Sequence, residues 1–212
     1  MKSNPIKIGI AGGAGYTGGE LVRILMNHPS AEIVFIYSKS NAGNLLSDVH
    51  PDLLGETEMK FSSSFLDKID VLFLCMGQGE SEKFLAENEI DTKNKIIDLS
   101  QDFRLISGIR NPESRIFVYG LPELHRNDIK RAGNIANPGC FATAIQLALL
   151  PLAENQLLND EVHISAVTGS TGAGQSLSAT NHFTWRNNNI SIYKAFQHQH
   201  LAEITQSVKQ LQ

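Results

Sequence analysis

The feature that most constrains the fold is a cluster of glycines between an apolar segment and an amphipathic one. Residues 6–11 (IKIGIA) form a short apolar run, and residues 12–18 (GGAGYTG) follow it directly. Residues 20–26 then place their apolar side chains on one face at helical spacing. The chain is therefore predicted to begin with a buried strand, a tight glycine-rich turn and a helix.

Further apolar segments alternate with helical ones. Residues 32–37, 71–75 and 95–99 are predicted to be strands, with a helix over residues 81–89 between the last two. Strands that alternate with helices favour a parallel sheet that is covered on both faces. We therefore predict an α/β fold with a Rossmann-type, doubly wound parallel sheet.

A second domain is predicted to follow the first. Residues 141–153 carry no charged side chain, which predicts a helix buried all round. Residues 162–168 are predicted to be a strand, and residues 200–210 a helix. We therefore expect a Rossmann-type domain over residues 1–139, followed over residues 140–212 by the start of an α+β catalytic and dimerisation domain.

Composition excludes several classes of protein. The 212 residues are 42% hydrophobic and 19% charged, which is ordinary for a globular chain with a core. The net charge is -4 without a basic block, so a nucleic-acid partner is not expected. No apolar run approaches the ~20 residues of a membrane span, and no membrane partner is expected. The two cysteines, Cys75 and Cys140, are too few for a disulfide framework and favour a reducing, cytoplasmic compartment.

The glycine cluster matches a dinucleotide-binding pattern, Gly-x-Gly-x-x-Gly from Gly13 and Gly-x-x-Gly-x-x-Gly from Gly12. Glycines permit a tight turn and let a pyrophosphate approach the backbone at a helix N-terminus. A plain strand-to-helix turn is the alternative, but the position between an apolar strand and a helix favours a dinucleotide. The predicted cofactor contacts are Gly12, Gly13, Ala14, Gly15, Tyr16, Thr17 and Gly18.

The end of the second strand indicates which dinucleotide is bound. NAD enzymes place an acidic residue here against the ribose hydroxyl, whereas this chain has Tyr37-Ser38-Lys39-Ser40. Ser38 and Lys39 are suited to a 2′-phosphate, although an ordinary solvated lysine is the alternative for Lys39. We predict NADP as the cofactor.

Cys140 is the candidate nucleophile. It follows Asn137-Pro138-Gly139 and begins the uncharged helix. Free backbone N–H groups and the helix dipole stabilise a thiolate at such a position, and the same amides suit an oxyanion. A small buried core residue is the alternative reading of a free cysteine, and it is our interpretation of Cys75.

A cysteine nucleophile needs a proton-transfer partner, and His198, His200 and Glu203 form the densest suitable cluster. Spacing alone does not choose between the two histidines. The His-x-His spacing also suits a metal, but no set of ligands completes a tetrahedral site, so we predict no metal.

Six ordered motifs span nearly the whole chain: GGAGYTGGEL at 12–21, IDLSQDFRL at 97–105, YGLPEL at 119–124, NPGCFAT at 137–143, TGSTGAG at 168–174 and HQHLAEI at 198–204. In these motifs the chain resembles the N-acetyl-gamma-glutamyl-phosphate reductase family of arginine biosynthesis. Aspartate-semialdehyde dehydrogenases share the overall plan but lack the YGLPEL and HxHxxEI motifs.

The resemblance implies an oxidoreductase that reduces N-acetyl-gamma-glutamyl phosphate with NADPH. The products are N-acetylglutamate semialdehyde and phosphate, and the reaction passes through a thioester on Cys140. The first histidine of the HxH motif, His198, matches the family's acid/base residue. A related N-acyl substrate such as the succinyl compound is the alternative.

The remaining candidates have supporting roles. Gly172 lies in a loop expected to close near the nicotinamide, and Ser100 and Arg104 suit the substrate phosphate because arginine forks match phosphate oxygens. A loop brace between Arg104 and Asp102 is the alternative. The expected substrate-binding residues are Ser100, Arg104, Asn137, His200 and Glu203.

The resemblance also implies that the last third of the family's sequence is absent. We therefore expect a C-terminally truncated chain that exposes apolar surface along residues 162–167 and is unstable or self-associates. A dinucleotide-binding fragment without turnover is then the alternative function. For the full-length form, the resemblance implies a homo-oligomer, either a dimer or a tetramer.

Overall fold

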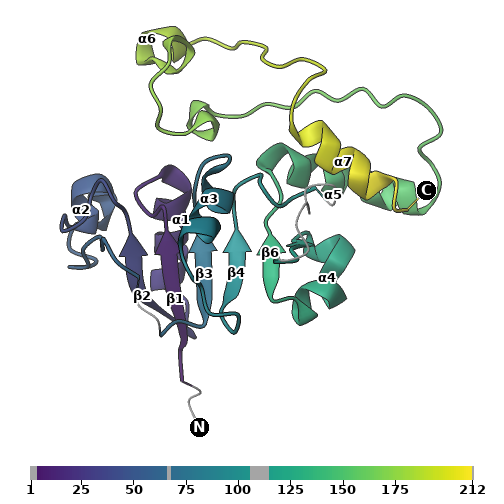
Figure 1. Cartoon of the computed structure of the whole chain (residues 1–212). Helices are drawn as coiled ribbons and strands as arrows, with labels where there is room; N and C mark the ends of the chain where they lie inside the picture. Colours follow the sequence, from purple (N-terminus) through teal and green to yellow (C-terminus); the bar gives the residue numbers. More distant parts are fainter. Residues whose placement is uncertain (1–3, 66–67, 106–114, 212) are drawn as a thin grey trace. The chain divides into compact units, whose positions relative to one another are not determined.

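The computed structural model describes residues 4–65, 68–105 and 115–211 (Figure 1). The chain divides into two compact units, Met1–Asn137 and Pro138–Gln212.

A six-stranded parallel sheet forms the first unit, in the order β2-β1-β3-β4-β6-β5. The four strands predicted in this unit are present, each within one residue of its predicted ends, and β5 and β6 were not predicted. The strands are β1 (Ile6–Ala11), β2 (Ala31–Tyr37), β3 (Val71–Leu74), β4 (Lys95–Asp98), β5 (Val118–Tyr119) and β6 (Asn134–Ala136).

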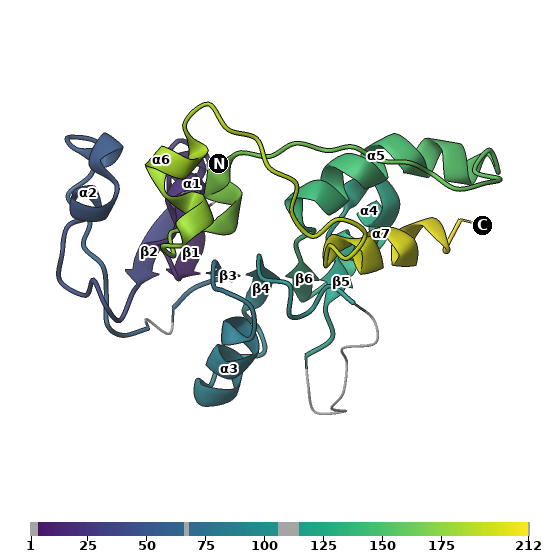
Figure 2. The same ribbon diagram turned by 90° about the horizontal axis from the view of Figure 1, so that it is seen from above.

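Helices cover both faces of this sheet, which confirms the doubly wound α/β prediction. Viewed along the sheet, α1 (Tyr16–Met26) and α3 (Glu80–Glu87) lie on opposite sides of the strands (Figure 2). A third helix, α4 (Pro122–Arg131), connects β5 to β6. Two short helical turns, α2 (Leu46–Val49) and η1 (Pro51–Leu53), lie between β2 and β3.

The sheet separates two apolar clusters. One contains Ile10, Val22 and Ile36 and packs β1 and β2 against α1. The other contains Leu72 and Phe84 and packs β3 and β4 against α3. Strands buried on both faces explain why the sequence shows continuous apolar runs here rather than alternation.

The connection after β1 creates a switch point. The chain leaves β1 towards β2 on one side, and then returns to β3 on the other side of β1. In doubly wound sheets the crevice at the carboxyl ends of such strands is where ligands bind. The glycine-rich segment starts at this edge, directly after Ala11.

The second unit contains two longer helices, α5 (Cys140–Glu154) and α7 (His200–Val208), which pack together. The segment between them forms three short turns: η3 (Ser170–Ala173), η4 (Ala179–Asn181) and α6 (Phe183–Arg186).

Helix α5 corrects one prediction, because it is not buried all round. Ala142, Gln146 and Leu150 are buried, whereas Leu147 is 43% exposed and Leu152 is 41% exposed. Within the described part of the second unit, α7 is the only helix of comparable length available to cover it. The absence of charged residues therefore predicted the helix correctly, but it did not predict how much of the helix is buried.

The strand expected over residues 162–168 is also wrong. These residues form no strand, because the described residues of the second unit place no other strand beside them. The associated prediction of exposed apolar surface is confirmed, since Val162 and Ile164 are each 45% exposed and Val167 is 79% exposed.

Candidate functional site

The glycine-rich turn has the backbone that the pattern predicts. Gly12 has φ +80°, a region that side chains disfavour, and a Cβ there would lie 2.5 Å from the Cys75 carbonyl oxygen. Its N–H donates to the Tyr37 carbonyl at 3.1 Å. The turn after β1 is thereby fixed against the ends of β2 and β3.

Helix α1 presents an uncapped N-terminus. Gly15 is its N-cap residue, in an extended conformation, and no described side chain caps the first turn. A Cβ on Gly15 would meet nothing closer than the Gly12 carbonyl oxygen at 3.7 Å, so the protein leaves space there. Open space at the positive end of a helix fits a pyrophosphate, and these residues therefore suit a dinucleotide.

The residues proposed for the 2′-phosphate follow β2 at the same edge of the sheet. Ser38 is buried, and its hydroxyl accepts a hydrogen bond from Asn41 Nδ2 at 3.3 Å and lies 3.5 Å from Ser40 Oγ. Lys39 is exposed. The turn therefore combines a hydroxyl cluster with one accessible cation and has no carboxylate, which suits a phosphate better than a ribose hydroxyl.

Arg104 is buried and braces two loops at the carboxyl edge of the sheet. Its Nε donates to the Asn137 carbonyl at 2.8 Å, and its Nη2 donates to the Leu99 carbonyl at 2.8 Å. Asp102, the alternative partner considered for Arg104, accepts hydrogen bonds from the N–H groups of Gly79 and Glu82 at the start of α3.

Sequence reasoning missed Asp98, a fully buried carboxyl at the end of β4. Ser100 Oγ donates to it at 2.7 Å and accepts from the Asp102 N–H at 3.1 Å. Burial raises the pKa of Asp98 above its usual value. An acidic residue that directly follows a buried apolar run was the available signal.

Cys140 and Cys75 have different environments. Cys140 is exposed and begins α5, with Gly139 as the N-cap residue. Cys75 packs against the core of the first unit. Burial, together with the charge of Asp98, raises the pKa of the Cys75 thiol to about 12. The exposed helix start therefore holds the better nucleophile.

Glu203 and His200 hold the residue that precedes Cys140. Glu203 is 3% exposed, and its Oε2 accepts the Gly139 N–H at 3.0 Å. The buried His200 ring packs against the Cα of Gly139 so closely that a Cβ there would collide with it. His200 Nε2 lies 3.9 Å from Glu203 Oε1. Helix α7 is therefore bound to the N-terminus of α5.

His198 lies beside this pair. Its Nδ1 accepts the His200 N–H at 3.2 Å, so in the neutral ring the proton is on Nε2. Burial lowers the pKa of His198, the charge of Lys194 lowers it further, and the charge of Glu203 opposes them. Its ring also stacks edge-on against Phe141, the residue after Cys140, with centroids 5.3 Å apart.

Tyr193 is a second residue that sequence reasoning missed. Its hydroxyl lies 3.4 Å from His198 Nε2, and its ring centroid lies 6.5 Å from that of Phe141. Burial and the charge of Cys140 raise the pKa of Tyr193. No motif marked Tyr193, because it reaches His198 only through the conformation of the loop between the two residues.

The last predicted cofactor contact, Gly172, lies in the second unit. Gly172 lies in η3, where a Cβ would meet Thr168 Oγ1 at 3.2 Å. In the parts of the chain that the structure describes, no group of three or more His, Cys, Asp or Glu side chains is arranged to hold a metal ion. Those parts also contain no helix with the length and apolar character needed to cross a membrane.

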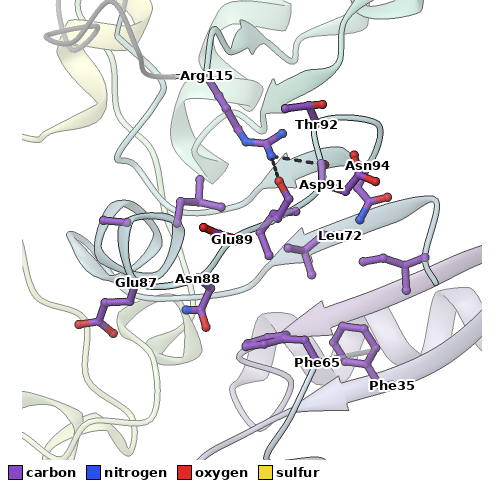
Figure 3. Close-up of a pocket in the computed structure, with 14 residues that line it drawn as sticks. Phe35, Phe65, Leu72, Glu87, Asn88, Glu89, Asp91, Thr92, Asn94 and Arg115 are labelled. Carbon is purple, nitrogen blue, oxygen red and sulfur yellow. Dashed lines mark hydrogen bonds between the residues drawn. The ribbon is translucent and has the colours of Figure 1, made fainter. Parts of the chain in front are cut away.

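A cavity of about 880 Å³ lies in the first unit (Figure 3). It is lined mainly by residues 85–92, at the end of α3 and in the loop that follows it, together with residues that include Leu72, Asn94 and Phe65. Arg115 donates to the carbonyls of Ile90 and Asp91 at its rim. No predicted site residue lines this cavity.

The chain is similar to semialdehyde dehydrogenases over most of its length. Residues 7–132 match the model of the semialdehyde dehydrogenase NAD-binding domain, and residues 140–212 match that of the semialdehyde dehydrogenase dimerisation domain. The chain is 58% identical over 207 residues to N-acetyl-gamma-glutamyl-phosphate reductase of Christiangramia forsetii and 59% identical over 207 residues to that of Flavobacterium johnsoniae. In both cases the alignment covers 98% of this chain and 63% of the relative, so the chain spans under two thirds of their length.

Solved structures with a similar fold include two aspartate-semialdehyde dehydrogenases. One is enzyme II of Vibrio cholerae, complexed with ASA, with a TM-score of 0.55 and 17% identity over 82% of this chain and 49% of that one. The other is the Candida albicans enzyme with NADP, with a TM-score of 0.53 and 16% identity over 73% of this chain and 48% of that one. At this identity the likeness concerns the fold.

Proposed function

Because the chain belongs to the semialdehyde dehydrogenase family, we propose that its protein reduces N-acetyl-gamma-glutamyl phosphate with NADPH to N-acetylglutamate semialdehyde, releasing phosphate. Identity of 58% to reductases of that name supports this substrate over aspartyl phosphate. The observation that carries the proposal is the exposed Cys140 at the start of α5, held by the buried Glu203 and His200 through Gly139.

Cys140 is the proposed nucleophile. Its thiolate attacks the acyl carbon, the bond from that carbon to the phosphate oxygen breaks, and a thioester forms as phosphate leaves. Backbone N–H groups at the start of α5 stabilise the oxyanion that forms during this attack. When bound, NADPH would supply the hydride that reduces the thioester carbon. The bond from that carbon to sulfur then breaks, so that the semialdehyde leaves and the Cys140 thiolate is restored.

His198 is the proposed proton-transfer residue. Because its Nδ1 accepts the His200 N–H, the proton that it presents is on Nε2. Its lowered pKa favours the neutral ring, in which Nε2 donates a hydrogen bond to the oxygen of the reacting carbonyl. Transfer of a proton to that oxygen requires the imidazolium form, which returns to the neutral ring. The Tyr193 hydroxyl at 3.4 Å adds a second polar group next to Nε2.

The proposed NADP domain is residues 1–139, which include the whole first unit, and the proposed catalytic and dimerisation domain begins at residue 140. Open space at Gly15 and the uncapped start of α1 support a pyrophosphate there, and the carboxylate-free turn at Ser38 and Lys39 supports a 2′-phosphate. The other proposed cofactor contacts are Gly12, Gly13, Ala14, Tyr16, Thr17, Gly18 and Gly172.

The proposed substrate contacts are Ser100, Arg104, Asn137, His200 and Glu203.

We further propose that the protein assembles as a homo-oligomer through its second domain, since residues 140–212 match a dimerisation domain. A nucleophilic thiol and two free cysteines fit the reducing cytoplasm.

The test is NADP⁺-dependent and phosphate-dependent oxidation of N-acetylglutamate semialdehyde, the reverse reaction. We expect Cys140→Ser to abolish turnover without changing the affinity for NADP⁺, while the matched variant Cys75→Ala keeps both. Turnover that survives in Cys140→Ser would refute the thioester mechanism. NADP⁺ binding without turnover in the unchanged chain would favour a nucleotide-binding role.

A further inference from the structure

Helix α1 contains a glycine that the dinucleotide pattern does not require. Gly13, Gly15 and Gly18 complete Gly-x-Gly-x-x-Gly, yet Gly19 follows as a buried residue inside the helix. Glycine is a poor helix former, so its presence here calls for a packing reason. A Cβ at this position would lie 2.6 Å from Cε1 and 2.7 Å from Nδ1 of His50. The missing side chain makes room for the His50 ring.

His50 reaches past Gly19 to the glycine-rich turn. It lies between α2 and η1, is 5% exposed, and places Nε2 at 2.8 Å from the Gly13 carbonyl oxygen. A carbonyl only accepts hydrogen bonds, so Nε2 carries the proton and donates it. A buried donor from a segment more than thirty residues away therefore holds one peptide of the turn.

The segment that carries His50 is itself fixed to α1. Asp52 makes two hydrogen bonds to Arg23, with Oδ2 2.5 Å from Nε and Oδ1 2.6 Å from Nη2. Leu46 and Leu53 are buried in the same apolar cluster as residues of α1 and β1. The residues that flank His50 in the sequence are therefore anchored, and they hold its imidazole in place.

We infer that His50 is a positioning residue of the dinucleotide site, a role that rests on the proposed NADP binding. In a trans peptide the C=O and the following N–H point in opposite directions. Donation from His50 to the Gly13 carbonyl thus fixes the orientation of the peptide between Gly13 and Ala14 within the turn. His50 acts through this backbone, because its ring donates to the Gly13 carbonyl.

Variants at His50 separate this role from simple packing. His50→Phe keeps a ring of similar size and removes the donor. His50→Gln keeps an N–H donor of similar reach, whereas His50→Asn offers the same group one carbon shorter. His28→Phe, at an exposed histidine of the same unit, is the matched control.

Two measurements on the full chain test the inference: hydrogen exchange of the amides of residues 12–18 without cofactor, and the Kd for NADP⁺ by calorimetry. Loss of one buried hydrogen bond predicts, for His50→Phe and His50→Asn, exchange and Kd each raised about fivefold to tenfold. For His50→Gln and His28→Phe we expect both within about twofold of the unchanged chain.

Unchanged exchange in residues 12–18 would overturn the inference, as would faster exchange without any loss of NADP⁺ affinity. If His50→Phe does not fold, the comparison of His50→Gln with His50→Asn decides in the same way. A failure of the unchanged chain to bind NADP⁺ would refute the proposed function, and the exchange data would then decide separately whether His50 holds the turn.

Discussion

Replacing Glu203 by alanine tests whether α7 holds the nucleophile-bearing helix start. The carboxylate is almost completely buried, and it accepts the N–H of Gly139, which is also buried. Gly139 directly precedes Cys140 and is the N-cap residue of α5. Truncation at Glu203 therefore removes the acceptor from a backbone donor that water does not reach.

The magnitude follows from the type of bond. A hydrogen bond to a charged group contributes about 1.5–3 kcal/mol, and a buried donor left without a partner loses a similar amount. Taking about 2 kcal/mol, the local opening equilibrium at Gly139 should shift roughly thirtyfold. Glu203→Gln keeps a side-chain oxygen as acceptor and loses only the charge, so its shift should be several-fold smaller.

The assay is native-state hydrogen exchange at the Gly139 amide, combined with the turnover number of the whole enzyme. In Glu203→Ala we expect the protection of Gly139 to fall about thirtyfold, and turnover to fall while the Kd for NADP⁺ is unchanged. Glu161→Ala, at an exposed carboxylate of the same unit, is the matched control. Wild-type protection of Gly139 in Glu203→Ala would show that this contact does not hold the helix start.

Two predictions concern titration. The hydrogen bonds from Arg23 hold the pKa of Asp52 below its usual value, so this pair stabilises the fold above about pH 4 and loses that effect as the pH falls further. Urea unfolding of Asp52→Asn should accordingly lack part of the wild-type loss of stability between about pH 5 and pH 3, and an identical pH dependence would contradict this assignment. For His198, whose pKa is lowered by burial and then by Lys194, Lys194→Met should raise the pKa followed by NMR, whereas Lys209→Met should leave it unchanged.

The sheet was predictable from the sequence because its signals are local. Apolar runs bounded by turns marked the first four strands, and their alternation with helices indicated a parallel sheet. The start of α1 was placed too late, at residue 20 instead of Tyr16. The reason is that Gly18 and Gly19 disfavour a helix intrinsically, whereas here packing against the turn and His50 keeps them helical.

The strand predicted over residues 162–168 is wrong because a strand depends on a partner elsewhere in the chain. Their apolar, β-branched composition fits a strand, but a strand needs a neighbour to accept its backbone hydrogen bonds. The described residues of the second unit provide no such neighbour. The sequence pattern therefore indicates that these residues can form a strand. Whether they do so depends on a neighbouring strand in the folded chain.

The candidate site was predictable in its residue types but not in its contacts. The start of α5 and the HxHxxE motif marked Cys140, His198 and Glu203. The hydrogen bond that links the two segments runs from the Gly139 N–H to the Glu203 carboxylate, across 64 positions of the chain. Tyr193 likewise reaches His198 only through the conformation of a loop. The first contact depends on tertiary packing and the second on the path of a loop, and residue spacing encodes neither.

The glycines of the first turn show how one motif can have several causes. A Cβ on Gly13 would collide with Ile36, and a Cβ on Gly18 would lie 2.6 Å from the Cα of Gly13, so both glycines are required by the protein's own packing. Gly19 is required by the His50 ring. Only Gly15 has an ordinary φ and space for a side chain, and so it alone has no explanation within the chain. The part of the motif that argues for a bound pyrophosphate is therefore the glycine that the fold itself does not need.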